Sequence, residues 1–157
     1  MKVIKFIQNE DGFTMDSSKY PSYVESVKDI LPKGALHFMS ADWHYDHRDP
    51  RCLHDAKINY MEVKEADKRV SIKISLSGSY GGKIRLDYIN VQYYKLKKQK
   101  SDWPIGVESH GDLMIDEMLI EDDGFLIHEI IFSDALLKIK HEDFQFSFES
   151  VDFDETV

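Results

Sequence analysis

The sequence predicts a mainly β protein of the α+β class. We expect an antiparallel meander of about seven to nine strands that closes into a barrel or a sandwich, with one N-terminal helix at about 20–31. Two observations lead to this prediction. After Ala56, short segments of alternating apolar and polar residues follow one another, separated by turn formers. Before residue 32, apolar residues recur at helical spacing instead.

Length and composition limit the classes of protein that fit. The 157 residues suit a single domain, 1–157, with its own hydrophobic core. The net charge of -9 opposes binding to nucleic acid or to an anionic membrane, and it suits a partner with a basic surface. One cysteine cannot form an intramolecular disulfide, and no apolar run approaches the roughly 18 to 20 residues of a membrane span. We therefore expect a cytoplasmic protein.

The first quarter of the chain predicts a strand, a helix and a second short strand. Val3–Ile7 is β-branched and aromatic and leads into turn formers, as in a hairpin arm or an edge strand. Pro32 ends the helix, and Ala35–Met39 is predicted as a short strand. The helix is predicted from six apolar residues that form one stripe: Tyr20, Tyr23, Val24, Val27, Ile30 and Leu31.

The β region begins at Lys57–Val63. Arg69–Ser77 alternates cleanly, and Gly78–Gly82 turns the chain back into a further strand, which predicts a hairpin. In that further strand the apolar positions change phase by one residue. A β-bulge produces such a change, so we predict one near Tyr88–Asn90.

The last third predicts a basic loop and then a meander. Lys95–Lys100 reads as a solvated run that opens a long loop to Gly111. Leu113–Ile120 and Phe125–Phe132 are predicted strands, joined by a turn whose Asp-Gly pair supplies positive φ angles. The closing strand is predicted from alternating aromatic residues: Phe144, Phe146 and Phe148.

The stretch Ala41–Ala56 holds three of the seven histidines and the only cysteine. Read as a metal site, its ligands are His44, His47, Cys52 and His54, a donor set suited to zinc or another transition metal. Their spacings match no finger, ribbon or H-E-x-x-H pattern, and no second ligand pair is marked elsewhere. Apart from this metal, no cofactor is expected.

Two other interpretations of the same stretch stay open. Its polar side chains organise a long loop, or its aromatic and arginine side chains anchor a protein partner. Cys52 and His54 also lie two residues apart, as a nucleophile and base could, but no oxyanion element accompanies them. We leave an enzyme open and favour a non-enzymatic protein. The predicted binding residues are Trp43, Tyr45, Arg48 and Arg51.

A family resemblance adds to these interpretations. It rests on His54-Asp55-Ala56 before a strand, the pattern Phe125-x-x-His128-x-x-x-Phe132, Leu137-x-Ile139 and a closing Asp143-Phe144. In these features the chain resembles small uncharacterised bacterial β-proteins, some of which look like immunity proteins of toxin systems. The resemblance implies a cytoplasmic bacterial protein without known catalysis, and it brings no catalytic residue.

Three functional hypotheses follow. The first is an immunity-like, non-enzymatic protein-binding module that uses the loop and the rim of the sheet. The second is a metal-binding protein or metal-dependent enzyme built on residues 42–55. The third is a homo-oligomer in which an exposed strand edge pairs with a copy of itself.

Overall fold

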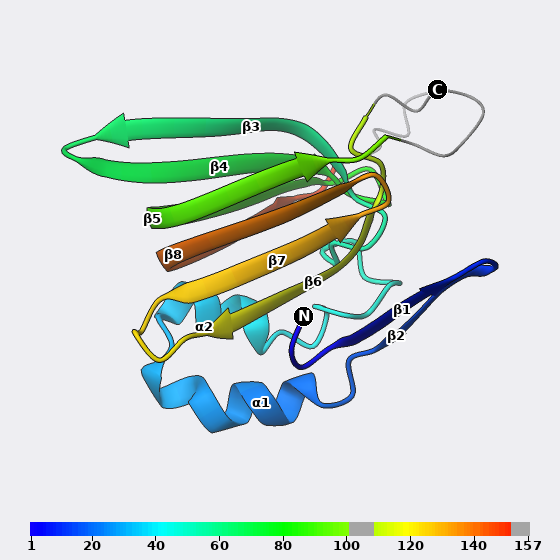
Figure 1. Ribbon diagram of the computed structural model, residues 1–157, viewed down its shortest axis with the longest axis horizontal. Helices are drawn as coiled ribbons and strands as arrows, with labels where there is room; N and C mark the ends of the chain where they lie inside the picture. Colours follow the sequence, from blue (N-terminus) through cyan, green and yellow to red (C-terminus); the bar gives the residue numbers. More distant parts are fainter. Residues whose placement is uncertain (101–108, 152–157) are drawn as a thin grey trace.

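The computed structural model describes residues 1–100 and 109–151, and it contains two antiparallel sheets (Figure 1). In the smaller sheet, β1 (Lys5–Asn9) pairs with β2 (Gly12–Asp16), so the predicted opening strand is an arm of a hairpin. The larger sheet has the strand order β3-β4-β5-β8-β7-β6. Its strands are β3 (Lys57–Ala66), β4 (Arg69–Ser77), β5 (Lys83–Lys98), β6 (Leu113–Ile120), β7 (Leu126–Phe132) and β8 (Ala135–Glu149).

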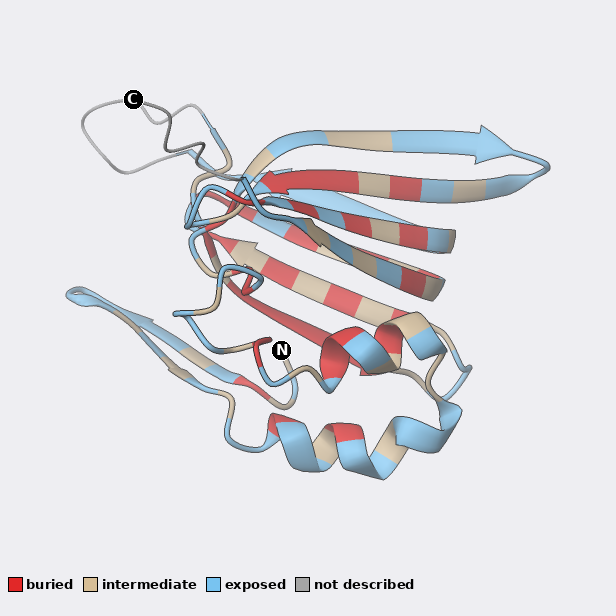
Figure 2. Ribbon diagram, turned by 180° about the vertical axis from the view of Figure 1, so that it is seen from behind, coloured by how far each residue is buried: buried red, intermediate tan, exposed pale blue. Residues whose placement is uncertain are grey.

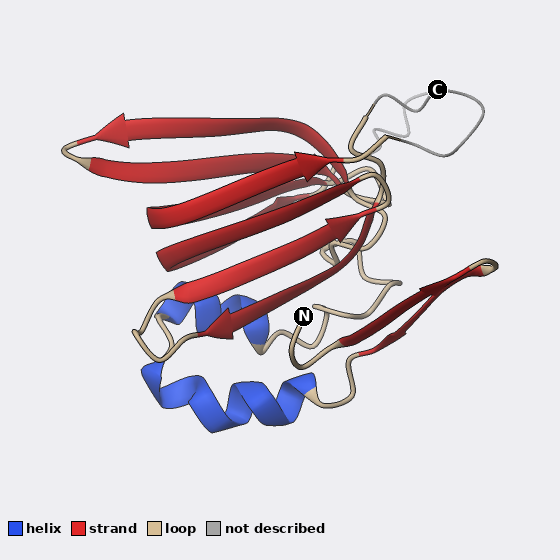
Figure 3. Cartoon of the chain, viewed as in Figure 1, coloured by secondary structure: helices blue, strands red, loops and turns tan. Residues whose placement is uncertain are grey.

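The larger sheet is not a closed barrel, so that part of the prediction is wrong. Its edge strands, β3 and β6, do not pair along their length. They approach at one end only, where Leu113 N–H donates to Ala56 O at 2.9 Å and Asp55 N–H donates to Leu113 O at 2.8 Å. Beyond this point the edges diverge, and the helices lie beside the opening (Figure 3).

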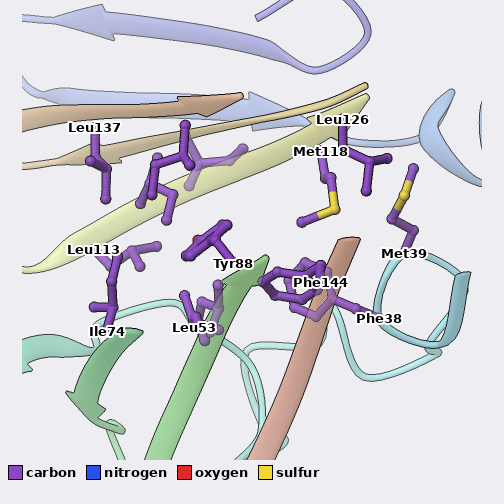
Figure 4. Packing of buried hydrophobic residues seen from close by; sticks show 14 of the residues in the cluster. Phe38, Met39, Leu53, Ile74, Tyr88, Leu113, Met118, Leu126, Leu137 and Phe144 are labelled. Atoms are coloured by element: carbon purple, nitrogen blue, oxygen red, sulfur yellow. The ribbon is translucent and has the colours of Figure 1, made fainter. Parts of the chain in front are cut away.

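The long strands β5 and β8 join two halves of the sheet. β4 pairs with only the first part of β5, from Lys83 to Tyr88, whereas β7 pairs with only the first part of β8, from Ala135 to His141. Both halves contribute side chains to one hydrophobic cluster. Figure 4 shows Tyr88 and Phe144 from one half near Met118 and Leu126 from the other.

The described part of the chain has two α-helices where we predicted one. They are α1 (Tyr20–Val27) and α2 (Lys33–Met39), with the 3-10 turn η1 (Lys28–Ile30) between them. The predicted strand at Ala35–Met39 is wrong because its buried residues, at positions 35, 38 and 39, follow the helical spacing of three and four. Pro32 ends the first helical segment and also stands at the N-cap of α2, where its fixed φ is compatible with a new helix.

Close packing places α2 against β8. A Cβ atom at Gly34 would lie 1.8 Å from Phe144 O, so only glycine permits this approach. One turn later the Phe38 ring lies 5.0 Å from the Phe144 ring. Helix α2 therefore covers the aromatic part of the sheet around Phe144.

The basic run is a strand, not the predicted loop, as far as Lys98. β5 continues because Lys95 and Leu96 pair with Lys138 and Leu137 of β8. The predicted phase change is confirmed: Asn90 has a φ of +51°, and the register shifts between Val91 and Tyr93, slightly beyond the expected position. Most of the loop that was predicted to follow lies outside the described residues.

Other predicted elements are confirmed. β4 and β6 have the predicted bounds. In the turn after β6, Gly124 has the predicted positive φ, +83°, but Asp123 does not. The closing strand is longer than predicted, since β8 begins at Ala135 and runs without a break through the polar segment His141–Asp143. No helix in the described part of the chain is long and apolar enough to cross a membrane.

The edge of β6 is covered by side chains instead of a strand. The N-terminal region and the Ala41–Ala56 stretch lie beside it, and their phenol groups satisfy its free backbone groups. The bonds run from Tyr45 to Asp116 O at 2.9 Å, from Tyr20 to Met118 O at 2.7 Å, and from Ile120 N–H to the Tyr23 hydroxyl at 2.9 Å.

Candidate functional site

The stretch Ala41–Ala56 is a loop of successive turns between α2 and β3. Aspartates organise these turns: Asp46 accepts a bond from Arg48 N–H at 3.1 Å, and Asp49 accepts one from Arg51 N–H at 2.9 Å. The Arg51 guanidinium also donates to Asp49, at 2.7 Å. These local bonds fix the path of the loop without any ligand.

The four predicted binding residues divide into two pairs. Trp43 is only 5% exposed and packs against Phe146, and Tyr45 is half-buried at the β6 edge. Arg48 and Arg51 are exposed, and the Arg51 guanidinium lies 5.4 Å from the centre of the Trp43 ring. The aromatic pair therefore supports the core, and the arginines alone present charge to solvent.

The four predicted metal ligands do not form a ligand set. Buried Cys52 donates its thiol hydrogen to His44 O, and burial raises the pKa of this thiol to about 11. The His47 and His54 rings stack face to face, with centroids 3.9 Å apart, and His54 Nδ1 donates to Met114 O at 3.0 Å. Among residues 1–100 and 109–151, no group of three or more His, Cys, Asp and Glu side chains could hold a metal ion.

His44 instead joins a buried polar network that sequence reasoning missed. Its Nε2 and that of His128 both donate to Asp116 Oδ2, at 2.8 and 2.9 Å. The Tyr88 hydroxyl shares a hydrogen bond with His128 Nδ1, at 2.8 Å. One signal could have revealed the network: His128 lies in the same strand phase as the apolar residues Leu126 and Ile130.

The electrostatics of the network are those of a buried ion. Burial raises the pKa of Asp116, but the charges and hydrogen bonds of His44 and His128 outweigh burial and hold this pKa below its usual value. Burial raises the pKa of the Tyr88 phenol well above its usual value. Each of the four side chains is at most 2% exposed. The network therefore cross-links the loop, β5, β6 and β7 out of reach of a substrate.

A small cavity separates this network from the surface. It measures about 10 Å³, and its lining includes His44, Cys52 and His54. A volume of this size is at the lower limit for one water molecule. It cannot admit an organic substrate.

A second buried carboxylate holds the N-terminal segment against the outer face of β6. Glu117, 1% exposed, accepts backbone N–H bonds from Lys2, Val3 and Ile4 at 2.6 to 2.7 Å. Such charge-assisted bonds are among the strongest hydrogen bonds in proteins. They fix the N-terminal segment as one wall of a groove.

That groove has a volume of about 460 Å³ and lies over the outer face of β6 and β7. Val3, Tyr23, Leu119 and Ile127 contribute its main apolar surface. Four carboxylates and two lysines also line it: Glu121, Asp122, Asp123, Glu129, Lys2 and Lys138. The volume falls within the usual range for binding sites.

No family model matches this sequence, and no curated protein matches it. The function is therefore argued from the geometry. The groove combines apolar contact area with charged groups that solvent reaches, and such a surface can bind a ligand without changing it chemically.

Proposed function

We propose that the protein is a non-enzymatic protein-binding module whose contact surface is the groove over β6 and β7. The observation that carries this proposal is the apolar floor of the groove, which lies beside a rim of carboxylates. Ile127 and Leu119 belong to paired strands, so the floor is rigid before a partner binds.

The charge of the groove favours a basic partner. Its lining carries four carboxylates against two lysines, and the whole chain has a net charge of -9. Lys140 and the N-terminal ammonium offset this negative charge locally, since Lys140 Nζ lies 2.8 Å from Glu121 and 2.5 Å from Asp123, and the N-terminal nitrogen lies 3.7 Å from Glu129. Asp122 is exposed at the rim and adds to the excess. The partner we infer presents apolar side chains flanked by lysine or arginine, as the basic surface of a toxin would for an immunity-like protein in the cytoplasm.

The placement of the reactive side chains also supports a binding role. The Cys52 thiol is buried and bonded to a carbonyl, and the His44–Asp116–His128 network is sealed. A nucleophile or base must reach its substrate within hydrogen-bonding distance. The geometry therefore favours a structural role for these buried groups and a binding role for the groove.

Nuclear magnetic resonance can test the proposal with a defined probe. A short peptide of alternating leucine and lysine is titrated into the labelled protein, and a peptide of alternating leucine and glutamate is the matched control. We expect the lysine peptide to shift the amide signals of Val3, Tyr23 and Ile127 in preference to those of β3. Equal shifts with both peptides, or shifts confined to other faces, would contradict the proposal.

A further inference from the structure

The larger sheet has one covered edge and one open edge. The β6 edge is covered by tyrosine hydroxyls, whereas β3 pairs with β4 on one side and with no described strand on the other. Figure 2 shows most of β3 exposed, at the end of the sheet away from the helices. Tyr60 and Val63 on this strand are 47% and 45% exposed. An uncovered edge of this kind is a template for another strand.

The hairpin geometry determines which backbone groups face the open edge. Asp67 and Lys68 form the loop between β3 and β4, with φ angles of 51° and 61°, and Ala66 pairs with Arg69. In a two-residue hairpin, the residues flanking the loop exchange both of their hydrogen bonds, and such pairs recur at every second residue. Even-numbered residues from 62 to 66 therefore bond to β4. Odd-numbered residues from 61 to 65 direct their N–H and C=O groups to the open edge.

The charges of β3 are complementary to those of a second β3 in one antiparallel register. If a two-fold axis passes through Val63, this residue exchanges two backbone hydrogen bonds with Val63 of the second copy. Glu62 of each copy then lies opposite Lys64 of the other, which gives two equivalent pairs of opposite charge. Within one chain these two side chains lie on the same face, 3.3 Å apart, so they need only exchange partners. An axis at residue 62 or 64 would place like charges opposite each other, which is unfavourable.

We propose that the chain forms a symmetric dimer through this edge, with β3 pairing antiparallel to β3 of a second copy about Val63. The two six-stranded sheets then become one continuous sheet across the axis. The irregularity between Ile58 and Tyr60 ends the regular part of the strand, which limits the interface to residues 60–66. A lysine in the middle of an edge strand commonly blocks pairing, but here a glutamate of the copy neutralises it.

Charge-swap variants test the dimer by sedimentation equilibrium. The wild type is expected to show twice the mass of one chain at high micromolar concentration. Lys64→Glu and Glu62→Lys should each weaken dimerisation at least tenfold, and the double variant Glu62→Lys/Lys64→Glu should restore it. When the two single variants are mixed, they should form a heterodimer. A monomeric wild type, or dimers unaffected by the single changes, would overturn the proposal.

A proline variant tests the backbone part of the interface. The Val63 N–H points to the open edge, so Val63→Pro leaves the β3–β4 bonds intact and removes two bonds at the axis. We expect this variant to be monomeric with an unchanged circular dichroism spectrum. The matched control, Val63→Thr, keeps the N–H and should remain dimeric. A dimeric Val63→Pro protein would also overturn the proposal.

Discussion

At the scale of single residues, Asp116 imposes the strictest requirement on its surroundings. Its carboxylate is buried and accepts hydrogen bonds from His44 and His128, so neither histidine can be replaced without leaving a polar group unpaired. Residues this distant in sequence could not be linked by spacing. The loop that carries His44 meets β6 only because α2 directs the chain there, and α2 was itself predicted as a strand.

Asp116→Asn should destabilise the protein by about 3 kcal/mol, since it removes the charge that the two histidines solvate. Urea unfolding at neutral pH measures this loss. The matched control is Asp112→Asn, because within the described residues the exposed Asp112 carboxylate makes only an ion pair with Lys57, at 3.5 Å. That change should cost less than about 0.5 kcal/mol. Equal effects of the two variants would show that the buried network carries no special stability.

His141 makes the stability depend on pH. Within the described residues neither ring nitrogen has a hydrogen-bond partner, and burial, together with the nearby charge of His128, lowers the pKa of His141 to about 3. An unfolded histidine has a pKa of about 6.5. Between these two pH values only the unfolded state takes up the proton. The free energy of unfolding is therefore unaffected by His141 above about pH 6.5, and it decreases as the pH falls toward 3. At pH 5 the loss is about 2 kcal/mol.

His141→Leu should therefore reduce the decrease in unfolding free energy between pH 7 and pH 5 by about 2 kcal/mol. The lowered pKa of Asp116 does not interfere, since its contribution is lost only below about pH 4. Exposed His37 supplies the control, and His37→Gln should leave the decrease unchanged. If the His141 variant loses as much stability on acidification as the wild type, this assignment is wrong.

At the level of elements, removing a single tyrosine hydroxyl tests whether these hydroxyls stabilise the edge of β6. Tyr20→Phe leaves the buried Met118 carbonyl without its donor and should cost about 1 to 3 kcal/mol in thermal or urea unfolding. Tyr80→Phe is the control, because the Tyr80 hydroxyl donates to His47 O at an exposed site. Similar stabilities for both variants would contradict the covering role.

Sequence reasoning predicted the elements whose pattern is local. Arg69–Ser77 was found with its bounds because alternation defines a strand between turn residues, and Leu113–Ile120 because the Asp-Gly turn directly follows it. The sequence does not predict those elements whose structure depends on contact with a distant segment of the chain. Lys95–Lys98 is a strand only because β8 lies beside it, and Glu117 binds the N-terminal segment across more than a hundred residues. The groove depends on the same distant contacts, so it could not be predicted.

At the level of the whole molecule, the proposed contact surfaces and the groups that stabilise the fold lie in different places. The polar groups with the strongest constraints lie inside, in the network around Asp116 and in the bonds of Glu117. The proposed binding groove lies on the outer face of β6 and β7, and the open β3 edge lies at the far end of the sheet. A partner can therefore bind in the groove of either copy of a β3 dimer.

Calorimetry with two variants can test whether the groove over β6 and β7 is the binding surface. Ile127→Lys places a charge on the half-buried groove floor, whereas Ile89→Lys places the same charge on an exposed apolar position of β5. We expect the affinity for the leucine–lysine peptide to fall at least tenfold in the Ile127 variant and to be unchanged in the Ile89 variant. An unchanged affinity in the Ile127 variant would contradict the proposal.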